Sequence, residues 1–166
     1  MAAAGNEKTD VQKLSELIKD IEIAMLTTAM PDGSLRSRPM MTQKSEFDGV
    51  LWFFTDARAG KVHELEADSH VNLSYAAPSH QRYVSVSGRA NMVQDRDKVR
   101  ELWSPVHKAW FPGGPDDPSL GLLKVEVAEA EYWDSPSGAV VKLVGLAKAL
   151  VTGERYQPGE NEKIKM

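Results

Sequence analysis

A cluster of basic and aromatic residues between positions 36 and 61 has the residue types of a ligand-binding site. Arg36 and Arg38 are two positions apart, so in a β-strand both guanidinium groups would leave the same face. The aromatic run 52–54 and Thr55 follow, and Lys61 comes six residues after the threonine. Two cations on one face repel each other unless they are solvated or bind an anion. The cluster therefore suits a flat ligand that carries negative charge.

A phosphate group is the anion that the end of this cluster suits. Thr55 offers a hydroxyl, Lys61 offers an ammonium group, and a short helix predicted over 60–67 offers backbone N–H groups at its start. The alternative interpretation needs no ligand: Arg36 and Arg38 form a solvated strand face, the aromatic run belongs to the core, and Lys61 lies on the surface. Composition alone favours this alternative, because aromatic strands usually belong to a core.

Several other chemistries lack their motifs. The sequence contains no G-x-G-x-x-G, H-E-x-x-H or G-x-S-x-G motif, and the Gly60-Lys61 pair lacks the flanking residues of a P-loop. The absence of cysteine excludes disulfides, iron–sulfur clusters and thiol nucleophiles. With 20 basic and 24 acidic residues, the net charge of -4 argues against a protein that coats nucleic acid. We therefore expect a local anion site, no protein metal site, and a bound cofactor for any redox chemistry.

The elements that must position this cluster are mostly strands. Alternating apolar residues predict strands over 23–28, 34–43, 50–55, 70–76, 82–93 and 122–133, and three-to-four spacing predicts helices over 11–21, 60–67 and 95–103. Residues 139–151 fit either a helix or a strand. We expect Thr9 or Asp10 to cap the first helix and Gly88 to mark a β-bulge. This order predicts a small antiparallel barrel with peripheral helices rather than a doubly wound α/β fold.

One domain is expected over residues 1–166, of which 42% are hydrophobic. The chain from Thr152 onward is polar and is expected to be loose. The loop 104–119 is rich in proline and glycine yet encloses Trp110 and Phe111, which suggests a function for these aromatic residues. No apolar run approaches the roughly 18 residues of a membrane span, and the first residues turn polar too soon for a signal peptide. We therefore expect a cytoplasmic protein.

Five segments, taken in their order, carry a resemblance to a known family. They are Arg36-Ser37-Arg38-Pro39-Met40, Leu51-Trp52-Phe53-Phe54-Thr55-Asp56 with Lys61 after it, Tyr83-Val84-Ser85-Val86-Ser87-Gly88-Arg89-Ala90, Trp110-Phe111-Pro112-Gly113-Gly114-Pro115, and Glu131-Tyr132-Trp133-Asp134. Together they resemble the pyridoxamine 5'-phosphate oxidase-like split-barrel flavoproteins, and specifically their general stress protein 26 branch. The resemblance covers nearly the whole chain.

The resemblance implies a mainly β fold, namely a six-stranded antiparallel split barrel, and a homodimer with FMN, or alternatively FAD, at the subunit interface. It implies that the strand 38–43 borders the isoalloxazine ring and that Thr55 and Lys61 belong to the phosphate clamp. Trp133 would approach the flavin from the partner subunit. The cofactor-binding residues implied are Arg36, Ser37, Arg38, Pro39, Met40, Trp52, Phe53, Phe54, Thr55, Lys61, Trp103, Trp110, Phe111 and Trp133, of which Trp103, Trp110 and Phe111 would cover the ring.

Two features depart from the oxidase pattern. Ala59 and Gly60 stand where oxidases commonly carry Ser and Arg, so the clamp lacks a hydroxyl and a cation. Arg36 or Arg38 would have to replace the missing charge. After Trp133 the chain lacks the Arg-x-His-x-Arg element with which oxidases hold their substrate. Pyridoxamine 5'-phosphate oxidase activity is therefore not expected.

The function that follows is an FMN-binding general stress protein acting as a flavin-dependent oxidoreductase, with the cofactor carrying the chemistry. No side chain stands out as a catalytic acid or base, and no motif specifies the substrate or the electron donor. One alternative is a non-catalytic flavin-binding stress or sensor protein. Another is a haem-binding split barrel that uses His63 or His107 as an axial ligand.

Overall fold

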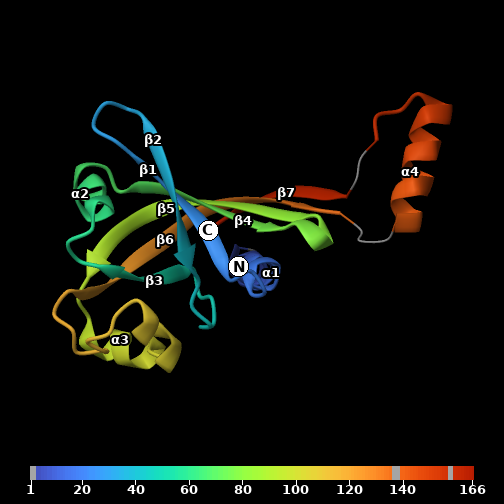
Figure 1. The fold of residues 1–166 in the computed structure, drawn as a ribbon. Coiled ribbons are helices and arrows are strands. Elements are labelled where there is room, and N and C mark those ends of the chain that lie inside the picture. The colour runs from blue at the N-terminus through green and yellow to red at the C-terminus, as the bar shows by residue number, and fades with distance from the viewer. Residues whose placement is uncertain (1–2, 136–138, 157–158) are drawn as a thin grey trace.

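The structure, a computed structural model, describes residues 3–135, 139–156 and 159–166. In chain order the helices and strands are α1 (Ala3–Ile18), β1 (Ile23–Ala29), β2 (Leu35–Met41), β3 (Val50–Asp56), α2 (Gly60–Ala67), β4 (His70–Ala77), β5 (Arg82–Val93), α3 (Arg96–Leu102), β6 (Leu120–Asp134), α4 (Ala139–Thr152) and β7 (Glu160–Lys165). Short 3-10 turns span Pro78–His80 and Pro105–Ala109. Figure 1 shows the strands as one curled sheet with helices around it.

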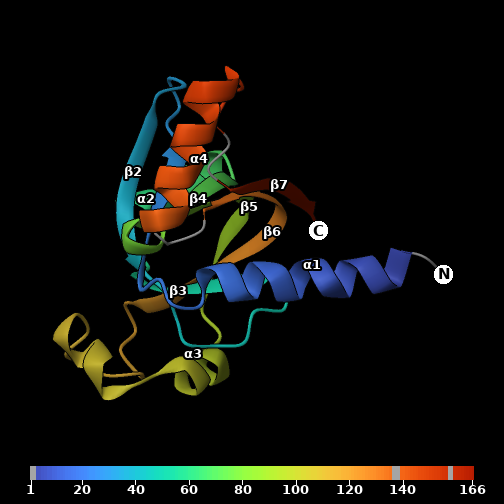
Figure 2. The ribbon, with the colours of Figure 1, turned by 90° about the vertical axis from the view of Figure 1, so that its right-hand side faces the viewer.

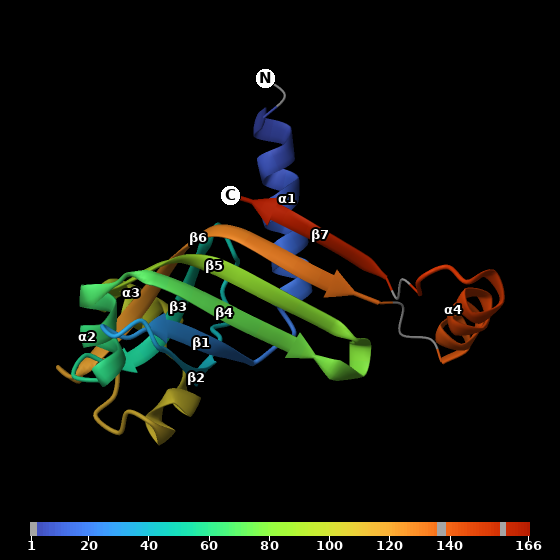
Figure 3. The ribbon, with the colours of Figure 1, turned by 90° about the horizontal axis from the view of Figure 1, so that it is seen from above.

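The sheet is antiparallel throughout and runs in the order β2-β1-β4-β5-β6-β3. The seventh strand, β7, pairs with the far half of β6. The long strands β5 and β6 curl, so that β3 returns toward β2 and the sheet forms a half-barrel (Figure 3). This arrangement confirms the predicted split barrel, and β7 adds a strand to the six that were predicted.

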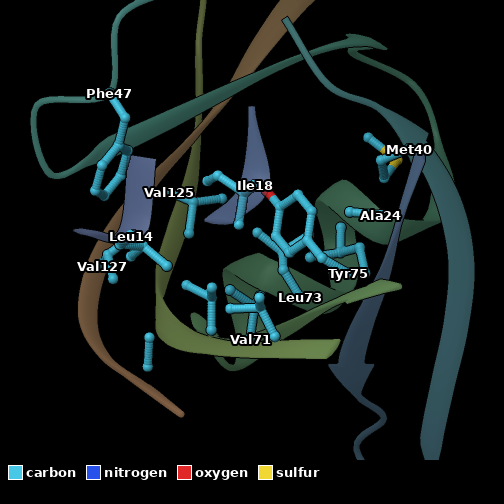
Figure 4. Packing of buried hydrophobic residues seen from close by; sticks show 14 of the residues in the cluster. Leu14, Ile18, Ala24, Met40, Phe47, Val71, Leu73, Tyr75, Val125 and Val127 are labelled. Atoms are coloured by element: carbon cyan, nitrogen blue, oxygen red, sulfur yellow. The ribbon is translucent and has the colours of Figure 1, made fainter. Parts of the chain in front are cut away.

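The concave face of the sheet holds the main hydrophobic core. Alternate residues of β4 point into it, because side chains in a strand alternate between faces: Val71, Leu73 and Tyr75 are all buried. Leu14 and Ile18 of α1 lie among these side chains (Figure 4). Figure 2 shows α1 beneath the curled sheet, with its N-terminal part extending beyond the strands. The helix therefore closes one end of the half-barrel with its apolar face.

A β-bulge bends the longest strand pair. The register between β5 and β6 shifts between Ser87 and Gly88, as the sequence predicted for this glycine. A Cβ atom at position 88 would overlap the backbone oxygen of Glu126. Only glycine allows this close approach of the two strands, and the bulge increases the local twist that closes the half-barrel.

A second, smaller apolar cluster lies outside the barrel core. Its buried residues are Val99 of α3 and Leu120 and Leu122 of β6. Six larger or longer side chains pack against it: Trp52, Phe54, Val93, Leu102, Trp103 and Phe111. This cluster fixes α3 and the loop 103–119 against the outer face of β3.

Two boundary predictions were wrong. The first helix begins at Ala3, before the predicted cap at Thr9 or Asp10. The chain after Thr152 is not loose throughout, because residues 160–165 form β7 and Ile164 is only 4% exposed. Ile164 is the one apolar residue in this charged strand, so the alternation that reveals other strands is missing here.

The segment that fitted either a helix or a strand is the helix α4. It projects away from the sheet at the end of the β6–β7 pair (Figures 1 and 3). Over residues 143–152 none of its side chains is buried, and Leu150 is 84% exposed. Among the described residues, no helix is long and apolar enough to cross a membrane.

Candidate ligand-binding site

A pocket of about 510 Å³ lies where β2, the end of β3, the start of α2 and the loop after α3 meet. It is lined by Pro39, Met40, Met41, Phe54, Thr55, Asp56, Arg58, Lys61, Trp110, Phe111, Pro112, Asp117 and Ser119. These residues come from positions far apart in the sequence. They lie close together because β2 and β3 are the two end strands of the sheet, and the curl of the sheet brings these ends toward each other.

One side of the pocket is apolar and aromatic. Phe54 forms part of it, and the ring centroid of Phe54 lies 6.4 Å from that of Phe111. Behind Phe54 stands His107, with ring centroids 4.5 Å apart, and Trp103, at 5.8 Å in an edge-to-face arrangement. Trp110 lines the same pocket and is largely exposed. The aromatic wall is thus held from behind and offers flat apolar surface to a ligand.

His107 supports this wall rather than lining the pocket. It is buried, and its ring nitrogen Nδ1 accepts a hydrogen bond from the backbone N–H of Ser104 at 2.9 Å. Burial lowers the pKa of His107, so the imidazole is neutral near pH 7. The helical turn that it caps places Trp110 at the mouth of the pocket.

The other end of the pocket is charged, with two basic and two acidic side chains in its lining. Lys61 lies in the first turn of α2, and Ala59 before it provides no side-chain cap for the N–H groups of that turn. Desolvation by burial lowers the pKa of Lys61, and the positive charge of Arg38 lowers it further. Among the described residues, Lys61 forms no ion pair within 4.0 Å. A half-buried ammonium group beside uncapped backbone N–H groups is suited to bind an anion.

A pair of opposite charges stands at the rim beside Lys61. Arg58 donates to Asp56 from Nε and from Nη2, at 3.1 Å in each case. The hydrogen bonds from Arg58 hold the pKa of Asp56 below its ordinary value. Arg58 was not among the residues predicted from the sequence, where the only indication of its role is its place in the loop between Thr55 and Lys61.

Arg36 and Arg38 leave the same face of β2, as predicted, but an acidic residue meets them there. Glu64 of α2 accepts a hydrogen bond from Arg38 Nη2 at 2.7 Å and lies 3.3 Å from Arg36 Nη1. Glu64 is only 7% exposed. The only indication of this pairing in the sequence is that Glu64 follows Lys61 by about one turn of the predicted helix, which places an acidic side chain near the expected anion site. The expected basic patch is therefore partly neutralised within the chain.

The pocket brings together some of the predicted cofactor-binding residues and leaves out others. It is lined by the predicted residues Pro39, Met40, Phe54, Thr55, Lys61, Trp110 and Phe111. Phe53 is 1% exposed in the barrel core, because it alternates with Phe54 along β3. Trp52 faces α3, where Lys98 lies over its ring at 5.3 Å. Ser37 hydrogen-bonds Thr27 on the outer face of the sheet.

Trp133 lies far from the pocket of its own chain. It stands near the end of β6, opposite Tyr83 of β5, and is 42% exposed. The pocket lies near the start of β6, whose first residue is Leu120. Within one chain, most of the length of β6 therefore lies between Trp133 and the pocket that contains Lys61.

An open antiparallel barrel with a mixed aromatic and charged pocket beside its end strands defines a split-barrel protein. The profile of the "Pyridoxamine 5'-phosphate oxidase like" family matches residues 9–157. The chain belongs to this family.

Three relatives extend the comparison. The protein bli-3 of Neurospora crassa is 34% identical over 154 residues, which cover 87% of this chain and 74% of that protein. A candidate general stress protein 26 from Jannaschia sp. CCS1 superposes with a TM-score of 0.75 at 26% identity, covering 100% of both chains. A general stress FMN/FAD binding protein from Xanthomonas citri is 29% identical, with a TM-score of 0.66, covering 76% of this chain and 89% of that one.

Proposed function

We propose that this protein binds FMN in the pocket between β2, β3 and α2. The observation that carries the proposal is Lys61, a half-buried ammonium group without an ion pair among the described residues, facing a pocket with one aromatic wall. The phosphate would lie on Lys61 and the first turn of α2, and the ring would lie toward Phe54 and Trp110. The solved relative from Xanthomonas citri, which its name describes as FMN/FAD binding, supports a flavin as the ligand.

The strand β2 suits the polar edge of the ring. It is an end strand of the sheet path, so within the described part of the chain one row of its backbone groups has no strand partner. Pro39 and Met40 of this strand line the pocket. Pro39 has no N–H and could offer only its C=O, whereas Met41, which also lines the pocket, could offer both a backbone donor and an acceptor to the pyrimidine edge of a flavin.

The residues of the chain position the cofactor, which supplies the redox chemistry when bound. His107 is neutral, buried and behind the wall, so it does not reach a substrate. Asp56 is held by Arg58. We therefore propose an oxidoreductase in which the protein binds, orients and shields the flavin. A non-catalytic flavin-binding stress protein is the alternative that the same pocket supports.

The haem alternative receives no support from the pocket. His63 lies on the exposed side of α2, and His107 is turned into the aromatic cluster. Neither residue lines the pocket.

We also propose that the protein is a homodimer with the flavin at the interface. Trp133 could reach a flavin only in a second copy, because its own pocket lies at the other end of β6. The helix α4 supports the same proposal: Leu143, Leu146 and Leu150 are all exposed. Helices that are apolar around most of their surface are buried in folded proteins. Both features lie at the same end of β6.

Absorbance of the purified protein tests the proposed function. We expect a yellow protein with the visible bands of a flavin, or a colourless protein that acquires them when FMN is added. Bleaching by a nicotinamide cofactor would favour the oxidoreductase, and a flavin that resists all common reductants would favour the binding protein. A protein that takes up neither FMN nor FAD would refute the proposal.

A further inference from the structure

The buried carboxylate of Glu64 is the feature of the molecule that ligand binding alone leaves unexplained. It accepts hydrogen bonds from Thr28 Oγ1 at 2.5 Å and from Arg38 Nη2 at 2.7 Å. Arg36 Nη1 approaches its other oxygen at 3.3 Å. Thr28 in turn accepts a hydrogen bond from Arg38 Nη1 at 2.6 Å. The network joins α2 to two strands, β1 and β2.

Glu64 is not needed simply to attach α2 to the barrel. Val62 and Leu65 of the same helix are buried and already provide an apolar contact. Burying a carboxylate is costly unless it is paired and hydrogen-bonded, and here every strong partner is a cation or a hydroxyl of the sheet. The carboxylate therefore has a use that an apolar residue at position 64 would not supply.

That use follows from the position of Arg38. Its side chain is 18% exposed and contacts Glu64, and Met40, two residues further along β2 on the same face, lines the pocket. The charge of Arg38 lowers the pKa of Lys61, which also lines the pocket. Without Glu64, the positive charges of Arg36, Arg38 and Lys61 would be offset, among the described residues, only by Asp56, which already accepts hydrogen bonds from Arg58. Glu64 offsets them within the empty protein.

We propose that Glu64 is an internal counter-anion of the phosphate end of the pocket, and that it competes with the phosphate of a bound flavin for Arg38. In the empty protein Glu64 stabilises the fold by neutralising the arginines. In the flavin-bound protein its negative charge repels the phosphate and weakens binding. The proposal rests on the proposed flavin site and adds that Glu64 keeps the affinity for phosphorylated flavins lower than the cations alone would give.

The test is Glu64→Gln, which keeps the size and an acceptor oxygen but removes the charge. We expect the Kd for FMN to fall by about threefold or more, since one repelling charge is lost. The Kd for riboflavin, which has the same ring but no phosphate, should stay within about twofold of the wild type. The melting temperature of the flavin-free variant should fall. Fluorescence titration of both flavins and thermal melting of the empty protein give these quantities.

Glu66→Gln is the matched control. Glu66 is exposed on the same helix, so its replacement changes the net charge equally without touching the arginines. It should leave the ratio of the two dissociation constants unchanged. Unchanged or weaker FMN binding in Glu64→Gln would overturn the proposal. So would an equal weakening of FMN and riboflavin, which is what a purely structural role predicts.

Two further measurements keep the outcome decisive. If Glu64→Gln does not fold, Glu64→Asp keeps the charge but withdraws it from Arg38 by one methylene. The affinity for FMN should then rise relative to the affinity for riboflavin, and an unchanged ratio would contradict the proposal.

If the wild type binds neither flavin, the proposed function fails, and inorganic phosphate becomes the probe. Phosphate should then raise the melting temperature more in Glu64→Gln than in the wild type. Equal shifts would reject the role of Glu64 as well.

Discussion

The charge on Lys61 is the single-residue feature on which the proposed flavin site depends most. Lys61→Ala should weaken FMN binding by about 1–3 kcal/mol, the range for loss of a charge-assisted hydrogen bond. Riboflavin binding should change little, because riboflavin has no phosphate for the ammonium group of Lys61 to bind. Fluorescence titration with each flavin measures both effects. Lys163→Ala, at an exposed position of β7, is the control, and FMN affinity equal to that of the wild type would remove Lys61 from the site.

The ionisation of Glu64 should make the empty protein sensitive to acid. The hydrogen bond from Thr28, followed by the hydrogen bond and charge of Arg38, lowers its pKa in the folded state below the ordinary value of 4.5. The resulting stability is present above about pH 4.5 and is lost as the pH falls through the lowered pKa. The facing groups Arg36 and Arg38 stay charged over this range.

Melting temperatures of the flavin-free protein between about pH 3 and pH 6 check this dependence. The loss on acidification should be smaller in Glu64→Gln than in the wild type, since the variant has no carboxylate to protonate there. Glu66→Gln should follow the wild type. Parallel curves for Glu64→Gln and the wild type would show that another carboxylate controls acid unfolding.

For single residues, the sequence indicated which residue types form the site better than it indicated which way their side chains point. It placed both Phe53 and Phe54 in the site, although neighbours in a strand face opposite sides and only Phe54 lines the pocket. It also treated the arginines of β2 as unneutralised. Glu64 is 26 residues from Arg38, and only the packing of α2 on the sheet brings the two together.

Among the elements, β7 is held by one buried side chain in a charged strand. Ile164 packs into the main core, opposite Ala130 of β6. Ile164→Ala should lower the free energy of unfolding by about 2 kcal/mol or more, because it removes buried apolar surface and leaves a cavity. Chemical denaturation measures the change. Ile23→Ala, at a half-exposed position of β1, should cost much less; equal losses would mean that β7 contributes little to the fold.

The elements that the sequence predicted correctly share one property. Strands such as β4 and β5 bury one face and expose the other, so their pattern is visible without knowledge of their neighbours. The strand β7 and the helix α4 lack such a pattern, since one is charged along its length and the other is apolar on most sides. Their structures depend on what they contact rather than on periodicity.

For the whole molecule, the fold could be predicted but the assembled site could not. The order of helices and strands, together with the family resemblance, indicated a split barrel, and the sheet has that architecture. The pocket depends on the curl that brings β2 and β3 together, which no local pattern specifies. In the proposed homodimer the site also includes Trp133 of a second copy, and only assembly of two chains brings that residue to the pocket.

The proposed dimer makes a prediction about shared sites. If Lys61 of one subunit and Trp133 of the other form each site, Lys61→Ala and Trp133→Ala should each weaken FMN binding in the homodimer. A mixed dimer of the two variants would carry both substitutions in one site and neither in the other. Unfolding and refolding the two variants together should therefore restore tight sites that neither variant has alone.

Light scattering first establishes that the wild type has about twice the chain mass of 18.3 kDa. Titration of the co-refolded mixture then counts the tight sites, with each variant refolded alone as the control. Leu143→Lys with Leu150→Lys should shift the wild type toward monomer, because both side chains are exposed apolar residues of α4. Recovered tight sites would require residues from both subunits. If refolding together restores none, or the wild type is a monomer, each site belongs to a single chain, and the exposed Trp133 has another role.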